Sequence, residues 1–141
     1  MPYISCWVQL IWATKNRQPL ITKELKPRLC SHIRENARKN KIHLDCIKGV
    51  KNHVHALVSL TATQTIADVL QALKGESSHW VNEEDLLRVH FEWQNDYMAL
   101  SMSASHVDRV REYIKNQEEH HRTITFAEEY QQFLERYNIR D

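Results

Sequence analysis

Several features that would place this chain in a specialised class of protein are missing. Only two glycines and three prolines occur in 141 residues, which excludes a collagen-like or low-complexity chain. No apolar run approaches the roughly 18 residues of a membrane span, and the N-terminus lacks the basic start and apolar run of a signal peptide. With 42% apolar and 26% charged residues, the sequence predicts a folded protein that stays in the cytoplasm.

The sequence is also too short to form two domains of ordinary size. Domains usually contain about 100 to 200 residues, and a chain of this length can bury one core. The sequence shows no internal repeat, linker or low-complexity tract. We therefore expect residues 1–141 to form one domain.

Cysteine is scarce and is not arranged in pairs. The three cysteines, Cys6, Cys30 and Cys46, are odd in number and widely spaced. No CxxC pair is present that would indicate a zinc site, and the spacing does not indicate a disulfide framework. We expect all three to be reduced, mostly buried thiols.

The formal net charge of +1 conceals an uneven distribution of charge along the chain. Residues 1–51 hold eleven Lys and Arg against three Asp and Glu, whereas residues 52–141 hold eight against fifteen. A protein that binds a polyanion needs positive charge on one face only. The basic first third therefore permits nucleic-acid binding, and a solvated helix surface stays the alternative. These basic residues are Lys15, Arg17, Lys23, Lys26, Arg28, Arg34, Arg38, Lys39, Lys41, Lys48 and Lys51.

The hydrophobic pattern switches between two periodicities. Alternating or β-branched runs predict strands, and apolar residues four apart after Thr22 and Thr65, two typical N-cap residues, predict helices. Strands are predicted at residues 3–13, 42–51, 53–60, 89–92 and 97–102, with hairpins joining the second to the third and the fourth to the fifth. Helices are predicted at residues 22–40, 65–80 and 105–117, and a short last helix is predicted to begin near Thr125.

The order of these elements favours one architecture. A β-α-β-β-α-β order followed by helices predicts an α+β fold of the ferredoxin-like (RRM-like) type. We expect an antiparallel sheet with helices packed mainly on one face. Because many unrelated functions share this fold, the function must be argued from particular residues.

The most informative tripeptide is His53-Val54-His55. Residues two apart on a strand project from the same face, so both imidazoles should lie side by side while Val54 points into the core. Two imidazoles on a rigid strand make a natural metal-binding edge. Because the chain has nine histidines, two ordinary surface histidines remain the alternative for this motif by itself.

A second candidate pair lies on the helix predicted at 105–117. A spacing of four residues puts Tyr113 and Gln117 on one helix face. A phenol has a pKa near 10, so a nucleophilic tyrosine needs an electrophile activated by a metal, and an amide oxygen from Gln117 can bind that metal. Taken alone, a tyrosine such as Tyr113 is more often a partly buried packing residue. The competing tyrosines are Tyr97, Tyr130 and Tyr137.

Six blocks of sequence, in order, resemble one known family. The blocks are WATKNRQPL at 12–20, NHVHALV at 52–58, LKGESSHW at 73–80, WQNDYMALSMS at 93–103, REYIKNQEEHH at 111–121 and TFAEEYQQFL at 125–134. Over nearly its whole length the chain resembles the HUH-superfamily single-tyrosine transposases of the insertion-sequence 200/605 type. Six blocks in the right order and spacing are far more specific than any one of them.

The resemblance implies a role for each of the candidate residues. His53 and His55 are the histidines of the HUH motif, Gln117 is the third protein ligand of a divalent metal, and Tyr113 is the nucleophile. The implied reaction cuts single-stranded DNA, forms a 5′-phosphotyrosine link and later rejoins the strand. The ligand set suits Mg²⁺ or Mn²⁺.

The resemblance also implies partners. Family members are homodimers in which the tyrosine helix of one subunit completes the site of the other, and they recognise hairpins in single-stranded DNA at the ends of the element. Lys15, Arg17 and Lys51 are the candidate contacts for DNA phosphates. Three tryptophans are candidates for stacking on bases, although core packing is the commoner role: Trp12, Trp80 and Trp93.

Three questions stay open at this point. His120 and His121 follow Gln117 and can approach the metal, but a solvent-exposed helix end is the favoured interpretation. A domesticated relative that processes genomic repeat hairpins would use the same chemistry. A ferredoxin-like nucleic-acid-binding module with incidental histidines would form no covalent adduct and need no metal.

Overall fold

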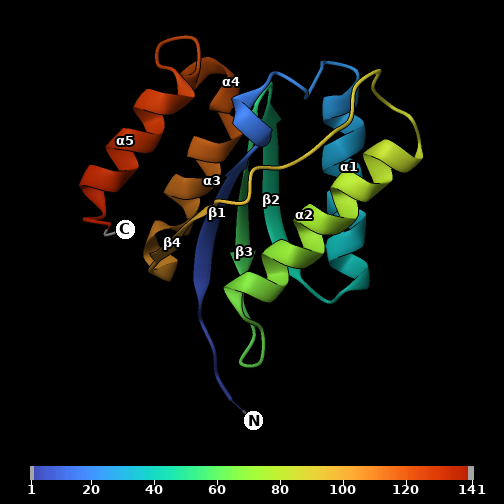
Figure 1. Cartoon of the computed structure of the whole chain (residues 1–141). Helices are drawn as coiled ribbons and strands as arrows, with labels where there is room; N and C mark the ends of the chain where they lie inside the picture. Colours follow the sequence, from blue (N-terminus) through green and yellow to red (C-terminus); the bar gives the residue numbers. More distant parts are fainter. Residues whose placement is uncertain (1, 140–141) are drawn as a thin grey trace.

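The computed structural model describes residues 2–139 and contains a four-stranded antiparallel sheet flanked by helices (Figure 1). The strands are β1 (Trp7–Ala13), β2 (His43–Val50), β3 (His53–Ser59) and β4 (Met98–Met102). The helices are α1 (Leu25–Lys39), α2 (Ile66–Glu83), α3 (Val107–Lys115), α4 (Gln117–His120) and α5 (Phe126–Arg136), with short 3-10 turns η1 (Lys15–Arg17) and η2 (Ala104–His106).

The sheet confirms the predicted fold class. Its strand order is β2-β3-β1-β4, with antiparallel pairing between all neighbours, and the chain follows the β-α-β-β-α-β order. The hairpin between β2 and β3 turns at Lys51 and Asn52, as the sequence predicts. The two middle strands, β1 and β3, each pair with a neighbour on both sides. Side chains on these strands are therefore held in place most firmly.

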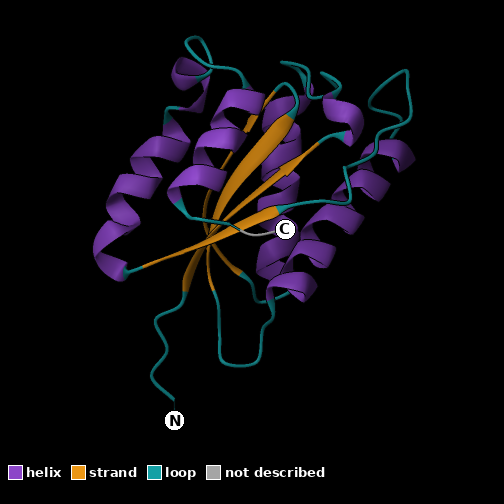
Figure 2. Ribbon diagram, turned by 60° about the vertical axis from the view of Figure 1, so that its left-hand side comes forward, coloured by secondary structure: helices purple, strands orange, loops and turns teal. Residues whose placement is uncertain are grey.

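The two faces of the sheet carry different helices. Alternation along β1 sends Val8, Leu10 and Trp12 into a core that is shared with α1 and α2, and sends Ile11 and Ala13 toward α5. Figure 2 shows helices on both sides of the strands. The structure thus differs from the expectation that helices pack mainly on one face.

The second layer of helices has a physical cause in the C-terminal sequence. Ile114 of α3 packs on Leu57, and Phe126 and Phe133 of α5 pack on Ile11 and its neighbours on the sheet. These apolar side chains need a surface to cover, and the free face of the sheet provides one. Periodicity identifies the apolar face of a helix but does not say which sheet face it covers.

The expected helix starts are found where threonine precedes the apolar run. The Thr22 hydroxyl accepts a hydrogen bond from the Leu25 amide at 3.1 Å, and the Thr65 hydroxyl accepts one from Asp68. Thr125 opens α5 with a capping box that Glu128 completes. These caps fix the point at which each helix leaves its loop.

The strand predicted at 89–92 is not formed. The Asn82 side chain instead accepts from the Phe91 amide at 2.8 Å and donates to the Phe91 carbonyl at 2.9 Å. Those backbone groups are thereby satisfied by a side chain, and only Trp93 makes an isolated bridge, to Thr14. The segment is an ordered loop fastened to α2, and β4 has no hairpin partner.

The tryptophans and cysteines are distributed between core and surface. Trp12 and Trp93 are buried edge to face, with ring centroids 5.9 Å apart, so they are core residues. All three cysteines are free thiols in the described chain, as expected, but the expectation of burial is wrong for Cys6, which is exposed.

Across residues 2–139 we find no helix of the length and apolarity that crossing a membrane requires.

Candidate metal and tyrosine site

The two histidines of β3 lie side by side on the sheet face that α3 and α5 cover. Their ring centroids are 5.1 Å apart, and the side chains of His53 and His55 are 0% and 1% exposed. Val54 between them is buried in the opposite core. The predicted placement is therefore found, but these are buried groups and not surface histidines.

Tyr113 and Gln117 reach the same place from the C-terminal layer. The rings of Tyr113 and His55 have centroids 5.9 Å apart, and the buried Gln117 amide donates to the Tyr113 carbonyl at 3.4 Å. The two residues do not share one continuous helix, because α3 ends at Lys115 and α4 begins at Gln117. They nevertheless meet, and a single chain brings its own tyrosine to its own histidines.

An ion pair holds the tyrosine helix against the sheet. The guanidinium of Arg111 donates to both carboxylate oxygens of Asp45, at 2.7 and 2.8 Å. Asp45 sits at an irregularity of the β2–β3 register between Leu44 and Cys46. This bidentate contact fixes α3 to β2 two residues before Tyr113.

Two further residues, His121 and Glu129, complete the cluster; the sequence interpretation missed Glu129 and favoured an exposed position for His121. The carboxylate oxygen Oε1 of Glu129 lies 3.1 Å from His55 Nε2, 3.2 Å from His121 Nε2 and 3.5 Å from His53 Nε2. The other carboxylate oxygen accepts a hydrogen bond from the Tyr113 hydroxyl. Candidate ligand atoms of the three histidines and Glu129 all lie within 4.8 Å of one another.

The sequence did contain a signal for Glu129. It lies three residues after Phe126 and four before Phe133, so it occupies the buried stripe of α5. A carboxylate in an apolar stripe needs a partner, because an isolated buried charge is costly. The favoured interpretation of His121 as an exposed helix end is wrong, since its side chain is 13% exposed and turned into the cluster.

Burial sets the charge states at this site. It lowers the pKa of His53 to about 4 and also lowers the pKa of His55, although Glu129 opposes both shifts. Burial alone would raise the pKa of Glu129, but its contacts with the histidine rings outweigh burial and lower it. Burial and the hydrogen bond to Glu129 raise the pKa of Tyr113. At neutral pH these shifts favour neutral β3 imidazoles, an ionised carboxylate and a protonated phenol.

The residues fit a divalent metal ion. The donor set combines imidazole nitrogens with carboxylate and amide oxygens, which are common ligands of such ions. His53 Nε2 is buried and has no hydrogen-bond partner among residues 2–139. Its other ring nitrogen, Nδ1, is 2.8 Å from the Asn52 side-chain oxygen, an outer contact of the kind that orients metal-bound histidines.

The candidate DNA contacts are divided between two places. Arg17 and Lys51 line a groove of about 770 Å³ that also reaches Lys23, Lys26 and His121. The remaining candidate, Lys15, is instead paired with Glu92 at 2.8 Å outside this groove. The structure thus brings two of the three predicted residues to the rim of the histidine cluster.

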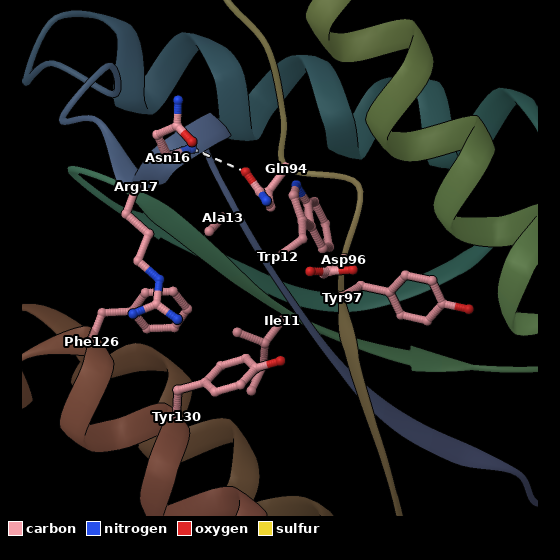
Figure 3. Close-up of a pocket in the computed structure, with 10 residues that line it drawn as sticks. All are labelled: Ile11, Trp12, Ala13, Asn16, Arg17, Gln94, Asp96, Tyr97, Phe126 and Tyr130. Atoms are coloured by element: carbon pink, nitrogen blue, oxygen red, sulfur yellow. Dashed lines mark hydrogen bonds between the residues drawn. The ribbon is translucent and has the colours of Figure 1, made fainter. Parts of the chain in front are cut away.

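A smaller pocket of about 450 Å³ adjoins this groove (Figure 3). The Arg17 guanidinium lies over the rings of Phe126 and Tyr130, at 5.0 and 5.4 Å from their centroids. Phe126 in turn stacks on His53 with centroids 3.8 Å apart. Across the pocket, the Asn16 amide donates to the Gln94 side chain at 3.0 Å. A basic and aromatic wall therefore leads to His53 and the histidine cluster.

Comparisons with known proteins find a family model and a relative of similar sequence. The model of a family described as IS200-like transposase matches residues 2–117. A curated relative, the ISDra2 transposase TnpA of Deinococcus radiodurans, is 28% identical over 113 residues, covering 77% of this chain and 81% of the relative.

Two solved structures share the fold. A crystal structure described as a candidate transposase from D. radiodurans R1 is 28% identical, with a TM-score of 0.67, and the match covers 83% of this chain and 95% of that one. A structure described as a REP-associated tyrosine transposase bound to a REP hairpin is 17% identical, with a TM-score of 0.63, covering 86% and 72%. The match in fold extends over most of the chain.

Proposed function

The chain belongs to the IS200-like transposase family, and from this premise we propose that it cleaves and rejoins single-stranded DNA at insertion-sequence ends through a 5′-phosphotyrosine intermediate. Residues 1–141 act as one domain in this proposal, in the cytoplasm where the DNA substrate lies. Tyr113 is the nucleophile, and His53, His55 and Gln117 hold a divalent metal, Mg²⁺ or Mn²⁺.

One observation carries the proposal. The hydroxyl of Tyr113 and the imidazoles of His53 and His55 all lie at the carboxylate of Glu129. These residues come from strands and helices far apart in the sequence. A candidate nucleophile and candidate metal ligands thus share one buried cluster, which is what phosphoryl transfer by a tyrosine requires.

The chain's own groups account for the steps of the reaction. The metal, when bound, supplies positive charge that stabilises the charge developing on the phosphate oxygens. The phenol of Tyr113 loses its proton, for which the hydrogen-bonded carboxylate of Glu129 is the nearest acceptor, and its oxygen attacks the phosphorus. The bond to the 3′ oxygen breaks, and that oxygen leaves and takes up a proton as a free 3′-OH.

The reverse step explains rejoining without an energy source. A 3′-OH attacks the phosphorus of the phosphotyrosine, the new phosphodiester forms, and the Tyr113 phenol is released. Because one ester replaces another in each direction, no ATP is needed. The enzyme in this proposal is a strand transferase as well as an endonuclease.

Two surfaces support an approach path for the DNA. Arg17 and Lys51, with the lysines beside them, line the groove next to His121. On the other side, Tyr113 opens onto a second groove, of about 560 Å³, together with Arg109 and Arg136. Positive charge on both sides of the cluster suits a phosphate backbone that crosses it, and DNA binding should weaken steeply with salt.

The arrangement of subunits is part of the proposal. The family resemblance implies a homodimer with sites shared in trans, whereas the single chain already assembles Tyr113 with its own His55. A mixing experiment between inactive variants, described in the Discussion, separates the two arrangements. A domesticated enzyme that processes genomic repeat hairpins uses the same chemistry, and it is distinguished by the absence of matching hairpin ends around its own gene.

The test is covalent trapping. The protein is incubated with Mn²⁺ and single-stranded DNA from the flanks of its own gene, and adducts are resolved on a denaturing gel. Wild type and the matched control Tyr3→Phe, which alters a tyrosine that is 96% exposed, should both form the adduct. Tyr113→Phe should form none while it still binds DNA. An adduct that persists in Tyr113→Phe would make another tyrosine, first Tyr97, the nucleophile.

A further inference from the structure

We propose that His121 and Glu129 are ligands of the divalent metal, so that the segment after α3 closes a site of three imidazoles, one carboxylate and the Gln117 amide. The match to the family model ends at Gln117, and both residues lie beyond it. The inference rests on the proposed function only in assuming that the site binds a metal.

The separations between donor atoms are those of ligands around one ion. The Oε1 atom of Glu129 is 3.1 to 3.5 Å from the Nε2 atoms of His55, His121 and His53. Ligand atoms that each lie about 2.0 to 2.2 Å from one ion, at angles of about 90° to 110°, are about 2.8 to 3.6 Å apart. The Gln117 oxygen, 3.0 Å from His121 Nε2, is close enough to join the same set.

The contact made by Nδ1 of His121 determines which ring nitrogen carries the lone pair. Nδ1 of His121 faces the Ile124 carbonyl at 3.2 Å, and a carbonyl can only accept a hydrogen bond. In the neutral ring Nδ1 therefore carries the hydrogen, and Nε2 presents its lone pair to the oxygens of Gln117 and Glu129. Three acceptors that face one another repel unless a cation lies between them.

His53 repeats this arrangement. Its Nδ1 faces the side-chain oxygen of Asn52 at 2.8 Å, so the lone pair of Nε2 is directed at Glu129. This Nε2 atom is buried without a hydrogen-bond partner in the described part of the chain. A buried polar atom left in this state costs free energy, and a metal bond removes that cost.

The donor set also indicates which metals bind best. Imidazole nitrogens favour first-row transition metals, whereas Mg²⁺ prefers oxygen ligands and retains several waters. Three imidazoles and a carboxylate therefore favour Mn²⁺, Co²⁺ or Zn²⁺ in affinity. Because Glu129 belongs to α5, binding of the ion also fastens α5 to β3.

The experiment measures metal binding directly, without DNA. Titration calorimetry gives the Mn²⁺ dissociation constant of wild type, Glu129→Gln and His121→Asn. The matched controls are Glu135→Gln and His79→Asn, which alter exposed residues of the same types. We expect the Mn²⁺ dissociation constant to rise about 10- to 100-fold in Glu129→Gln and His121→Asn and to stay unchanged in the controls.

A melting experiment keeps folding separate from binding. Mn²⁺ should raise the Tm of wild type and of both controls, and this rise should be reduced or lost in Glu129→Gln and His121→Asn. The Tm without metal reports whether each variant is folded. Unchanged Mn²⁺ affinity in both folded variants would overturn the proposal and leave Glu129 as a structural partner of the histidines.

The adduct assay distinguishes this failure from failure of the proposed function. A Tyr113-dependent adduct in wild type, combined with normal Mn²⁺ affinity in Glu129→Gln and His121→Asn, overturns the ligand assignment alone. Wild-type protein that binds no divalent metal overturns both the ligand assignment and the metal part of the proposed function. The Tyr113→Phe comparison tests the nucleophile in either case.

Discussion

The two faces of strand β3 are equally buried near its start but carry opposite chemistry. On β3, Val54 and Ala56 face α1 and α2 in an apolar core, while His53 and His55 face the C-terminal helices. All four side chains are shielded from solvent to within 1% exposure. Burying imidazoles and a carboxylate costs free energy that apolar packing would not cost. The apolar face thus stabilises the fold, and the buried polar groups of the other face are the candidates for chemistry.

This difference predicts the largest effect at the histidines. The double variant His53→Ala/His55→Ala should lose cleavage by at least about a thousandfold, because metal activation of a phosphate is worth several kcal/mol. Its free energy of unfolding without metal should change far less than its activity. Single-turnover cleavage and urea denaturation measure the two quantities. If the double variant is unfolded under the assay conditions, the main role of these histidines is to stabilise the fold.

A substitution on the apolar face should do the opposite. Leu29 of α1 is fully buried in the core between α1, α2 and the sheet. Leu29→Ala should lower the free energy of unfolding by about 2 to 5 kcal/mol. Cleavage per folded molecule, measured well below the Tm, should be nearly unchanged. A large loss of activity in fully folded protein would show that the two faces are not independent.

Gln117 tests how far the polar site extends. Gln117→Ala should raise the Mn²⁺ concentration for half-maximal cleavage by about one to two decades, by analogy with losses of supporting groups around metals. Activity should recover in part when Mn²⁺ is raised. An unchanged metal requirement with a lower Tm would remove Gln117 from the site and leave it as a packing residue between Tyr113 and Glu129.

Mixing inactive variants tests whether one chain supplies the whole polar face. Tyr113→Phe protein and His53→Ala/His55→Ala protein are combined and allowed to exchange subunits. Sites shared in trans restore part of the cleavage, because a heterodimer then holds one intact site. A mixture that stays inactive supports the arrangement within one chain, in which Tyr113 lies beside its own His55.

The smallest effect is expected where the tyrosine helix joins the sheet edge. The hydrogen bonds from Arg111 lower the pKa of Asp45. The resulting stability is present above about pH 4, the pKa of an unfolded aspartate, and is lost as the pH falls through the folded pKa. Asp45→Asn should cost about 1 kcal/mol or less at pH 7, because the pair is partly exposed. Urea denaturation should show this difference shrinking below pH 4.

The sequence predicted the polar face in part. His53, His55 and Tyr113 were identified because strand alternation and six ordered blocks pointed to them. Glu129 was missed, since a helix pattern shows that a residue faces inward but not which residues it meets across the fold. The false strand at 89–92 has a similar origin. Its alternation was real, but the side chain of Asn82 satisfies the backbone in place of a second strand.

The central claim is that Tyr113, at the polar face, is the group that becomes joined to DNA. The most direct test is to trap the adduct with Mn²⁺ and single-stranded DNA, digest the protein and the DNA, and locate the modified peptide by mass spectrometry. We expect a 5′-phosphonucleotide on the Tyr113 side chain and on no other tyrosine. A nucleotide on Tyr97, Tyr130 or Tyr137, or cleaved DNA with no protein-linked nucleotide, would contradict it.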